Sequence, residues 1–452
     1  MESQAVNINL RVQITNRQIL KIALPIAAAI LVPQINFITN NIFLGGLGEQ
    51  SLAVAGITGV YYLIFAVIGF GLNNGLQSLI SRRAGENRIQ EIGNLFNQGI
   101  RITLVFSAFS ILITYFIAPV ILAASLHDPS NVQMAVHFLY IRIWGLPFLY
   151  VYQMRNALLV GTNNSRYLIA GTLAETITNI VFDYSLIYGH FGLPQLGFNG
   201  AALSSILAEA TGLFVIFGVM HKRGLGKQLQ LFKKYSYDAA NTKLMLVQSL
   251  PLVVQHVISV AGWEFFYILV EHHGERDLAI SNTMRNIFGF FGCVTWAFGS
   301  AANSMVSNVI GQGLHQRVME LILKIMKLSL GFACFIFLLL NITPALFLHI
   351  YKQGNDFITA AIPVVRVVSI AMLFMACASI WLNAVIGTGN TKVNLAIELF
   401  AICIYCGYVY LILEYLDLSI VIGWTAEWVY WSCVLIPSFL YLRSGRWKHK
   451  KI

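Results

Sequence analysis

Long apolar runs dominate this sequence, and short breaks rich in glycine, asparagine and charged residues separate them. A helix needs roughly 20 consecutive apolar residues to cross a hydrocarbon core about 30 Å thick. It is the natural spanning element because it satisfies its own backbone hydrogen bonds. Charged residues make up only 11% of the chain, against about 25% in soluble domains. The pattern therefore predicts an all-α polytopic membrane protein and excludes a soluble domain.

Twelve membrane-spanning helices are predicted from these runs. Their approximate ranges are 19–44, 52–76, 95–124, 133–158, 167–189, 198–220, 244–270, 278–304, 319–350, 357–386, 393–415 and 418–441. The longest polar stretch, residues 222–243, lies between the sixth and seventh helices. We interpret it as a cytoplasmic linker between an N-terminal lobe, residues 1–221, and a C-terminal lobe, residues 244–452.

An internal repeat relates the two lobes. ALP at 23–25 recurs as SLP at 249–251, GEQSLAV at 48–54 as GERDLAI at 274–280, and VGTNNSR at 160–166 as IGTGNTK at 386–392. The offset is the same in each pair and equals half of the 452-residue chain. Because an even number of spans keeps both copies in the same orientation, we expect a pseudo-twofold axis along the membrane normal. Alternating access, with one lobe rocking against the other, is then the default mechanism.

Basic residues are distributed unequally between the two sides of the membrane. Twenty Lys and Arg residues fall on the side that holds both termini, and only Arg276 and Lys352 fall in the opposite loops. Cytoplasmic loops carry the excess of Lys and Arg, so both termini are expected in the cytoplasm. The net charge of +10 does not indicate nucleic-acid binding, because these residues lie in the gaps between helices without a basic face.

Ionisable side chains at bilayer depth are costly, so each one is a candidate for function. The fifth helix carries Glu175, Asn179 and Asp183 at positions i, i+4 and i+8, which places them on one side of that helix. The first helix carries Asn36 and Asn40 at i and i+4. Carboxylate and amide oxygens on such helices suit a small cation or a proton.

Prolines and hydroxyls accompany these residues. Pro25 and Pro33 lie within the first helix and remove backbone hydrogen bonds there, and Pro251 is the repeat equivalent of Pro25. All three are predicted to kink their helices. Ser204 and Ser205 of the sixth helix add oxygen ligands suited to a hard ion. The alternative is that the asparagines only form hydrogen bonds between helices.

Four segments resemble a known family. They are LPIAAAILVPQINFITNNIFLGGLG, LISRRAGENR, RNALLVGTNNSRYLIAGTLAETITNIVFDYSLIYG and LGFNGAALSSILAE. They are similar to helices one, two, five and six of the multidrug and toxic compound extrusion (MATE) transporters of bacterial type, and the resemblance covers nearly the whole chain. It implies two six-helix lobes around a central cleft, residence in the bacterial inner membrane, and cation-coupled antiport of organic, mostly cationic compounds.

The resemblance also implies roles for single residues. Asn179 and Asp183 match the family's Asn-x-x-x-Asp motif, Ser205 matches its helix-six hydroxyl, and Pro25 matches its helix-one proline. The family's helix-one aspartate falls on Asn40, so one of the two usual charges is missing. Asp183, Asn179 and Asn40 can hold sodium as the coupling ion, and Asp183 alone can instead carry a proton.

The C-terminal lobe offers aromatic side chains beside carboxylates. Trp424, Glu427, Trp428 and Trp431 share one face of the last helix, and Trp263 precedes Glu264 on the seventh helix. Aromatic faces next to a carboxylate attract lipophilic cations. We therefore assign Glu264, Trp263, Glu427 and Trp428 to a substrate cleft. The alternative is that these tryptophans belong to interfacial belts, and Trp424, near a helix end, is assigned to such a belt.

The remaining polar residues are interpreted as structural. Arg142 and Arg366 are expected to pair with acids such as Glu175 or Glu398, and His256 to be a satisfied polar group, although it can also relay a proton to Glu264. A Cys-x-x-Cys pair, Cys403 and Cys406, is interpreted as packing. No organic cofactor is expected.

Three classes of function compete. The first is a proton- or sodium-coupled antiporter for lipophilic organic cations. The second is a flippase for lipid-linked saccharides, which usually needs a broad basic cavity. The third, a membrane-embedded transferase, lacks its motifs here, since neither H-E-x-x-H nor G-x-x-x-x-G-K-[ST] occurs. The sequence favours the antiporter, in contact with membrane lipids, without an obligate protein partner and without enzymatic activity.

Overall fold

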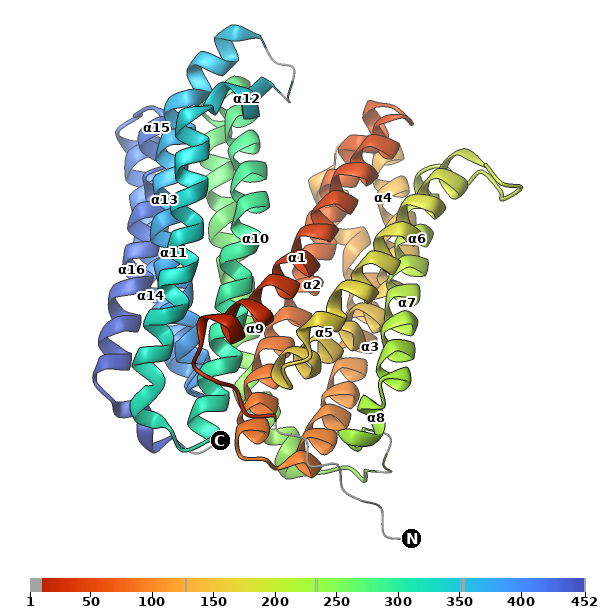
Figure 1. Ribbon diagram of the computed structural model, residues 1–452. Coiled ribbons are helices and arrows are strands. Elements are labelled where there is room, and N and C mark those ends of the chain that lie inside the picture. Colours follow the sequence, from red (N-terminus) through yellow and green to blue (C-terminus); the bar gives the residue numbers. More distant parts are fainter. Residues whose placement is uncertain are drawn as a thin grey trace. The chain divides into compact units, whose positions relative to one another are not determined.

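The computed structural model describes residues 10–126, 128–231, 233, 235–349, 351 and 354–450. Within these residues the chain forms helices and turns and no strand (Figure 1). All twelve predicted segments are largely helical. Ten helical segments of the described part are long and apolar enough to span a membrane, and the other two, α6 (Leu168–Tyr188) and α10 (Glu275–Gly311), carry more polar residues.

The chain divides into two compact units. Unit 1 holds Leu10 and Ala28–Ser249, and unit 2 holds Arg11–Ala27 and residues 250–450. The division therefore runs inside two long helices, α1 (Asn16–Gly45) and α9 (Ala239–Glu271), and differs from the predicted lobe boundaries at 221 and 244. Pro25 and Pro251 lie close to these two points, and each helix continues through its proline.

Unit 1 contains the helices of the first repeat. They are α2 (Glu49–Gly85), α3 (Ile89–Ser125), α4 (Pro129–Arg142), α5 (Leu146–Gly161), α6, α7 (Phe198–Lys222) and the short α8 (Leu225–Gln228). A single turn of 3-10 helix, Ile143–Gly145, joins α4 to α5. The two therefore form one span.

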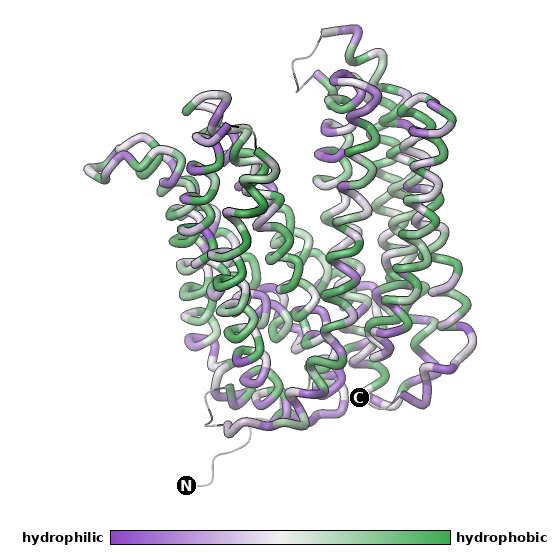
Figure 2. Tube along the Cα trace, turned by 180° about the vertical axis from the view of Figure 1, so that it is seen from behind, coloured by the Kyte–Doolittle hydropathy of each residue, from purple (hydrophilic) through white to green (hydrophobic). Residues whose placement is uncertain are grey.

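Unit 2 contains the helices of the second repeat. They are α10, α11 (Val318–Ile342), α12 (Pro344–His349), α13 (Asn355–Gly387), α14 (Thr391–Val409), α15 (Ile420–Gly423) and α16 (Ala426–Arg443). Figure 2 shows apolar residues along the helices of each unit and polar residues gathered in many of the connections at their ends. This distribution is what a membrane-spanning protein requires.

The repeat extends to the backbone conformation of its turns. Gly48 and Gly274, which occupy equivalent positions of the two copies, precede α2 and α10 with φ of 110° and 107° and ψ of 168° in both. Asn163 and Gly389, a second equivalent pair, both have positive φ, 62° and 88°. Asparagine and glycine are the residues that adopt this left-handed conformation at least cost. The predicted duplication is therefore present in the fold.

The linker is attached to unit 1. Asn94 and Gln98 of α3 donate hydrogen bonds to Asp238 Oδ2 (2.8 Å) and to the Ser236 carbonyl (3.0 Å). Asp238 also accepts from the backbone amide of Asn241 (3.1 Å) and so caps the start of α9. The amide of Asn241, followed by the side chain of Asn94, lowers the pKa of Asp238 below its ordinary value. The linker therefore belongs structurally to α3 and α9.

The segment before α1 has a similar attachment in unit 2. The Val12 amide donates to Asn308 Oδ1 (3.1 Å), and Lys324 of α11 donates to the Ile14 carbonyl (3.2 Å). Lys324 occupies the position in the second repeat that Gln98 occupies in the first. The first helix of each repeat is therefore preceded by a chain segment fastened to α3 or to α11, its repeat equivalent.

Close contact between α6 and α7 sets the geometry of the candidate site. A Cβ atom added to Gly200 of α7 would lie 2.6 Å from the Leu186 carbonyl oxygen, and one added to Gly171 of α6 would lie 3.2 Å from the Gly212 carbonyl oxygen. Glycine at these positions lets the two backbones touch. Residues 204 and 212 of α7 are thereby brought against the polar face of α6.

Candidate functional site

Asp183 and Asn179 lie buried on α6, with 0% and 4% of their surface exposed. Asn179 donates from Nδ2 to Ser204 Oγ (3.1 Å), and Ser204 Oγ donates to the Asn179 carbonyl (3.0 Å). The Ser204 hydroxyl also lies next to the Asp183 carboxylate, but its single hydrogen cannot serve the Asn179 carbonyl and Asp183 at once. Within the described part of the chain, neither oxygen of Asp183 has a hydrogen-bond partner.

The first helix reaches α6 at the level of this carboxylate. The Phe43 ring packs against Tyr184 and Tyr188, with ring centroids 6.4 and 6.2 Å apart, and Tyr188 Oη donates to the Phe43 carbonyl (2.7 Å). Asn40 precedes Phe43 by three residues and Asp183 directly precedes Tyr184. Asn40 and Asp183 therefore each lie within one helical turn of this contact, on α1 and α6.

Several acceptor atoms in this region lack donors. Among the described residues, the side-chain oxygens of Asn36, Asn40 and Asp183 are shielded from solvent without a hydrogen-bond partner. Buried polar atoms are almost always paired, since an unpaired one costs about 1–3 kcal/mol. Unpaired oxygens on a carboxylate and two amides are therefore suited to a bound cation or proton.

Two of the predicted ligands have other contacts. Ser205 donates to the Ala201 carbonyl of its own helix (2.9 Å), so the α7 hydroxyl that bonds Asn179 belongs to Ser204. Glu175 is half-buried and packs against Gly212 of α7. A Cβ atom added to Gly212 would lie 3.0 Å from the Glu175 Cβ atom. The spacing of residues 175, 179 and 183 predicted a common side of this helix, and Asn179 and Glu175 both contact α7.

Arg142 forms its ion pair with Glu209. The sequence analysis expected an acid such as Glu175, and this expectation is wrong. The Arg142 guanidinium donates to both carboxylate oxygens of Glu209, at 2.5 and 3.1 Å, and stacks 3.8 Å from the centre of the Tyr62 ring. The sequence analysis missed this pair because residues 142 and 209 lie on different helices. Helical spacing predicts contacts only within one helix.

Arg155 of α5 is a second buried cation that the sequence analysis did not single out. Its side chain is 0% exposed and lies 3.8 Å over the Tyr152 ring. None of its three guanidinium nitrogens has a hydrogen-bond partner among the described residues. A guanidinium over an aromatic face is a cation–π contact, and Glu175 of α6 adds an electrostatic attraction to the same guanidinium.

The carboxylate of Glu427 is buried inside unit 2. Glu427 is 6% exposed and accepts hydrogen bonds from Tyr405 Oη (3.4 Å) and Trp431 Nε1 (3.1 Å). Trp428, one residue later, is half-buried and donates to the Val367 carbonyl of α13 (2.9 Å). The predicted association of an acid with tryptophan side chains is present at residues 427 and 431.

Glu264 and Trp263 lie beside a cation that the sequence analysis did not consider. Arg285 of α10 has its guanidinium 3.8 Å from Glu264 Oε1 and 5.7 Å from the centre of the Trp263 ring. The side chains of residues 264 and 285 are 34% and 36% exposed. The charge of Glu264 is thus partly balanced within unit 2.

The positions of Trp424 and His256 can be compared with what the sequence analysis expected of them. Trp424 was assigned to an interfacial belt, and this is wrong, because it is 1% exposed and donates to Ser281 Oγ (3.1 Å). His256 Nδ1 lies 2.6 Å from the Leu252 carbonyl of its own helix. That contact agrees with a satisfied polar group.

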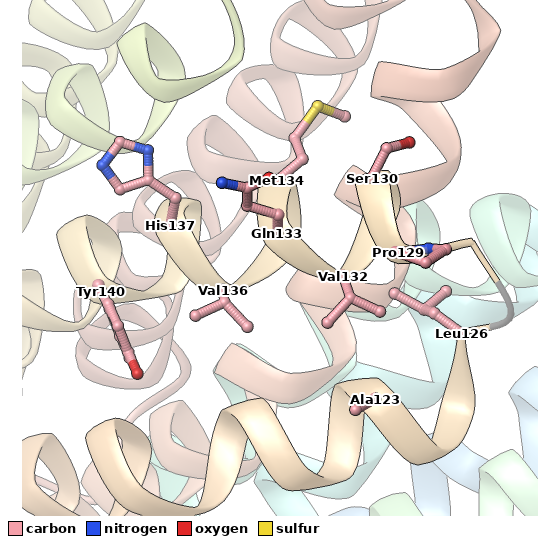
Figure 3. A pocket seen from close by; sticks show the side chains of 10 residues that line it. All are labelled: Ala123, Leu126, Pro129, Ser130, Val132, Gln133, Met134, Val136, His137 and Tyr140. Carbon is pink, nitrogen blue, oxygen red and sulfur yellow. The ribbon is translucent and has the colours of Figure 1, made fainter.

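An open surface pocket of about 910 Å³ lies where α3 meets α4. In Figure 3, Val132 and Val136 of α4 face the end of α3 that carries Ala123, while Gln133 and His137 lie on the other side of α4. No residue of the predicted sites lines it. It therefore plays no part in the arrangement around Asp183.

A family model describes most of this chain. The MatE model matches twice, at residues 25–185 and 251–411. The second match is displaced from the first by half of the chain length, which is the offset of the repeat. The chain belongs to the MatE family. MatE proteins are transporters and not enzymes, so this chain is an integral membrane protein of a transporter family.

Three relatives are described as probable multidrug resistance protein NorM. That of Thermotoga maritima is 20% identical over 96% of this chain and 94% of its own length. That of Synechocystis sp. is 27% identical over 43% of this chain, and that of Agrobacterium fabrum 23% identical over 65%. The chain spans 42% and 63% of the lengths of these last two proteins, less than two thirds of either.

Solved structures show the same fold. A crystal structure of MATE in complex with MaL6 matches with a TM-score of 0.89 at 17% identity, covering 98% of both chains. The outward-facing conformation of a multidrug resistance MATE family transporter of the MOP superfamily matches with a TM-score of 0.87 at 16% identity, also covering 98% of both chains. The all-α, polytopic fold predicted from the sequence is thereby confirmed.

Proposed function

We propose that this protein is a secondary antiporter that exports amphiphilic, mostly cationic organic compounds in exchange for an inward flow of protons or sodium ions. We place it in a bacterial inner membrane with both termini in the cytoplasm. The observation that carries the proposal is the set of buried, unpartnered oxygens of Asp183, Asn36 and Asn40 among the described residues. These atoms lie within unit 1, on two helices that meet at Phe43 and Tyr184.

The coupling ion binds at this set of oxygens. A carboxylate with no hydrogen-bond donor is costly in a membrane interior, and a cation or a proton removes that cost. With asparagine at position 40, a single carboxylate is available, so the site takes one positive charge. Sodium would use Asp183 with the amide oxygens of residues 40 and 179, whereas a proton would need Asp183 alone.

Transport requires that ion binding changes the balance between two access states. Both α1 and α9 belong to two units, and each changes unit near a proline. A proline removes one backbone hydrogen bond and lowers the cost of bending. We infer that bending near Pro25 and Pro251 accompanies the change of access, and that an ion at Asp183 affects it through α1.

The substrate is proposed to be an aromatic monovalent cation of the ethidium type. Glu427 and Glu264 supply negative charge in unit 2, and Trp431 and Trp263 lie next to them. The names of the relatives, which refer to multidrug resistance, support a broad range of organic compounds.

Transport by the purified full-length protein in proteoliposomes tests the proposal. Ethidium uptake or release is followed under a proton gradient and, separately, under a sodium gradient. We expect one of the two gradients to drive transport. We also expect Asp183→Asn, which keeps the side-chain shape, to lose at least tenfold of the driven rate.

Glu175→Gln on the same face of α6 is the matched control and should retain part of the driven rate. Both variants must be present at the wild-type protein level. Wild-type rates in Asp183→Asn would show that coupling resides at another residue. Absence of driven transport by the wild type under both gradients would contradict the antiport itself.

A further inference from the structure

A second buried carboxylate, Glu398 of α14, lies in unit 2 among hydrogen-bond donors only. It is 1% exposed. Its Oε1 accepts from Ser259 Oγ of α9 (2.6 Å) and from Tyr430 Oη of α16 (2.6 Å), and its Oε2 accepts from Gln255 Nε2 of α9 (3.4 Å). Three helices therefore converge on one acid.

The charge of Glu398 has no counter-ion in this arrangement. Among the described residues, no Lys, Arg or His forms an ion pair with it. The titratable groups that face it are Tyr430, and beyond that ring Tyr405 and Glu427, none of which carries positive charge. A buried charge that is not paired costs several kcal/mol, and uptake of one proton by Glu398 removes that charge.

The surrounding groups suit a proton better than a metal ion. Asn394 Nδ2 donates to Gln255 Oε1 (2.5 Å), which turns the NH₂ group of Gln255 toward Glu398. In this arrangement Ser259, Tyr430 and Gln255 all donate to the carboxylate, and the Gln255 oxygen, which could serve a hard cation, is turned away toward Asn394. No group of three or more His, Cys, Asp or Glu in the described part is placed to hold a metal ion.

Ser259 gives the site two arrangements of its hydrogen bonds. Its hydroxyl lies within reach of Glu398 Oε1 (2.6 Å) and of the Gln255 carbonyl one turn earlier (2.9 Å), but it has one hydrogen. When Glu398 is charged, Ser259 donates to it. When Glu398 takes up a proton, its new O–H donates to Ser259 Oγ and Ser259 donates to the Gln255 carbonyl. Both states are then hydrogen-bonded, and the only atom gained is one hydrogen.

We propose that Glu398, with Ser259, Gln255 and Tyr430, is a proton-binding site in unit 2, separate from the site at Asp183. Two of its partners lie on α9, the helix that is shared between the units. Both partners lie in the part of α9 that belongs to unit 2, so all four residues of the site lie within one unit. The proton binding stands independently of transport, while its use in transport rests on the proposed antiport.

Infrared difference spectroscopy of the full-length protein in lipid bilayers tests this site. The C=O stretching band of protonated carboxyl groups is recorded as the pH is changed. We expect Glu398→Gln to lose the band of one carboxyl group per chain. Glu320→Gln is the control, because Glu320 lies on the exposed surface of α11 with Arg317 and Lys324 as partners, and it should leave that band unchanged.

Two variants keep the acid and test its surroundings. Tyr430→Phe and Ser259→Ala each remove one hydrogen bond from the carboxyl group, and each should move the frequency of the same band. These two variants test the proposal even if Glu398→Gln does not fold. An unchanged spectrum in Glu398→Gln, or an unmoved band in both other variants, would overturn the proposal. Loss of the band on adding sodium at constant pH would also overturn it, since the site would then bind the metal ion. Failure of transport leaves this test unaffected, because the measurement needs no gradient.

Discussion

At the scale of single residues, unit 1 buries charge in pairs whose members lie on different helices. Arg142 of α4 and Glu209 of α7 share two hydrogen bonds, and their side chains are 13% and 8% exposed. Tyr62 of α2 donates to the same carboxylate (3.4 Å). The pair therefore connects α2, α4 and α7. Of these helices, α7 packs against α6, which carries Asp183.

Removal of one partner should be more harmful than removal of both. Arg142→Met leaves Glu209 buried without its cation, and we expect unfolding to become easier by about 3–5 kcal/mol. The double variant Arg142→Met/Glu209→Gln should recover much of this loss, because no buried charge remains. Thermal unfolding of the purified protein in lipid gives the comparison. Wild-type stability of Arg142→Met would show that the pair is dispensable, and an equal loss in the single and double variants would show that the unpaired Glu209 charge is not the cause.

At the scale of elements, close contact between α6 and α7 depends on glycine. The Cβ atom of an alanine at position 200 would lie 2.6 Å from the Leu186 carbonyl oxygen, closer than such atoms can approach. Position 218, further along α7, has open space around it. We therefore expect a glycine-to-alanine substitution to change the stability of the protein in opposite directions at these two positions of α7.

Gly200→Ala should destabilise the protein by about 1–3 kcal/mol, because it overpacks the contact between α6 and α7. Gly218→Ala should stabilise it by about 0.5–1 kcal/mol, because alanine favours a helix interior. Unfolding temperatures of the two variants, measured in the same lipid, check both signs. A neutral Gly200→Ala would mean that α6 and α7 can separate without cost.

At the scale of the whole molecule, the duplicated unit and the charge distribution together set the topology. Both repeats have an even number of spans, so equivalent loops lie on the same side of the membrane. The linker between the repeats carries six basic residues in 222–243, and its end is fastened to α3 through Asn94 and Gln98. This places the linker on the side that we assign to the cytoplasm.

Cysteine labelling in intact cells checks this orientation. In a variant whose six native cysteines are replaced by alanine, Gln50→Cys should react with a membrane-impermeant maleimide added outside. Lys227→Cys, in the linker, should react only after the membrane is permeabilised. Labelling of Lys227→Cys in intact cells would reverse the proposed orientation.

The sequence by itself determined the class of protein, the twelve helices and their duplication. These features depend on local rules, because the length of an apolar run must match the bilayer and a repeated motif needs the same turn. Asn163 and Gly389 illustrate this, since each supplies the positive φ that its turn requires. The polar face of α6, with residues 175, 179 and 183, also follows from helical spacing alone.

Only the tertiary structure decided which side chains meet. The partner of Arg142 is Glu209, the hydroxyl that bonds Asn179 belongs to Ser204, and Trp424 is buried. The donors around Glu398 come from α9 and α16, 139 residues before it and 32 residues after it along the chain. The physical reason is that a hydrogen bond depends on the rotation and height of two packed helices. Helical spacing defines the face of each helix, whereas packing against other helices decides what that face contacts.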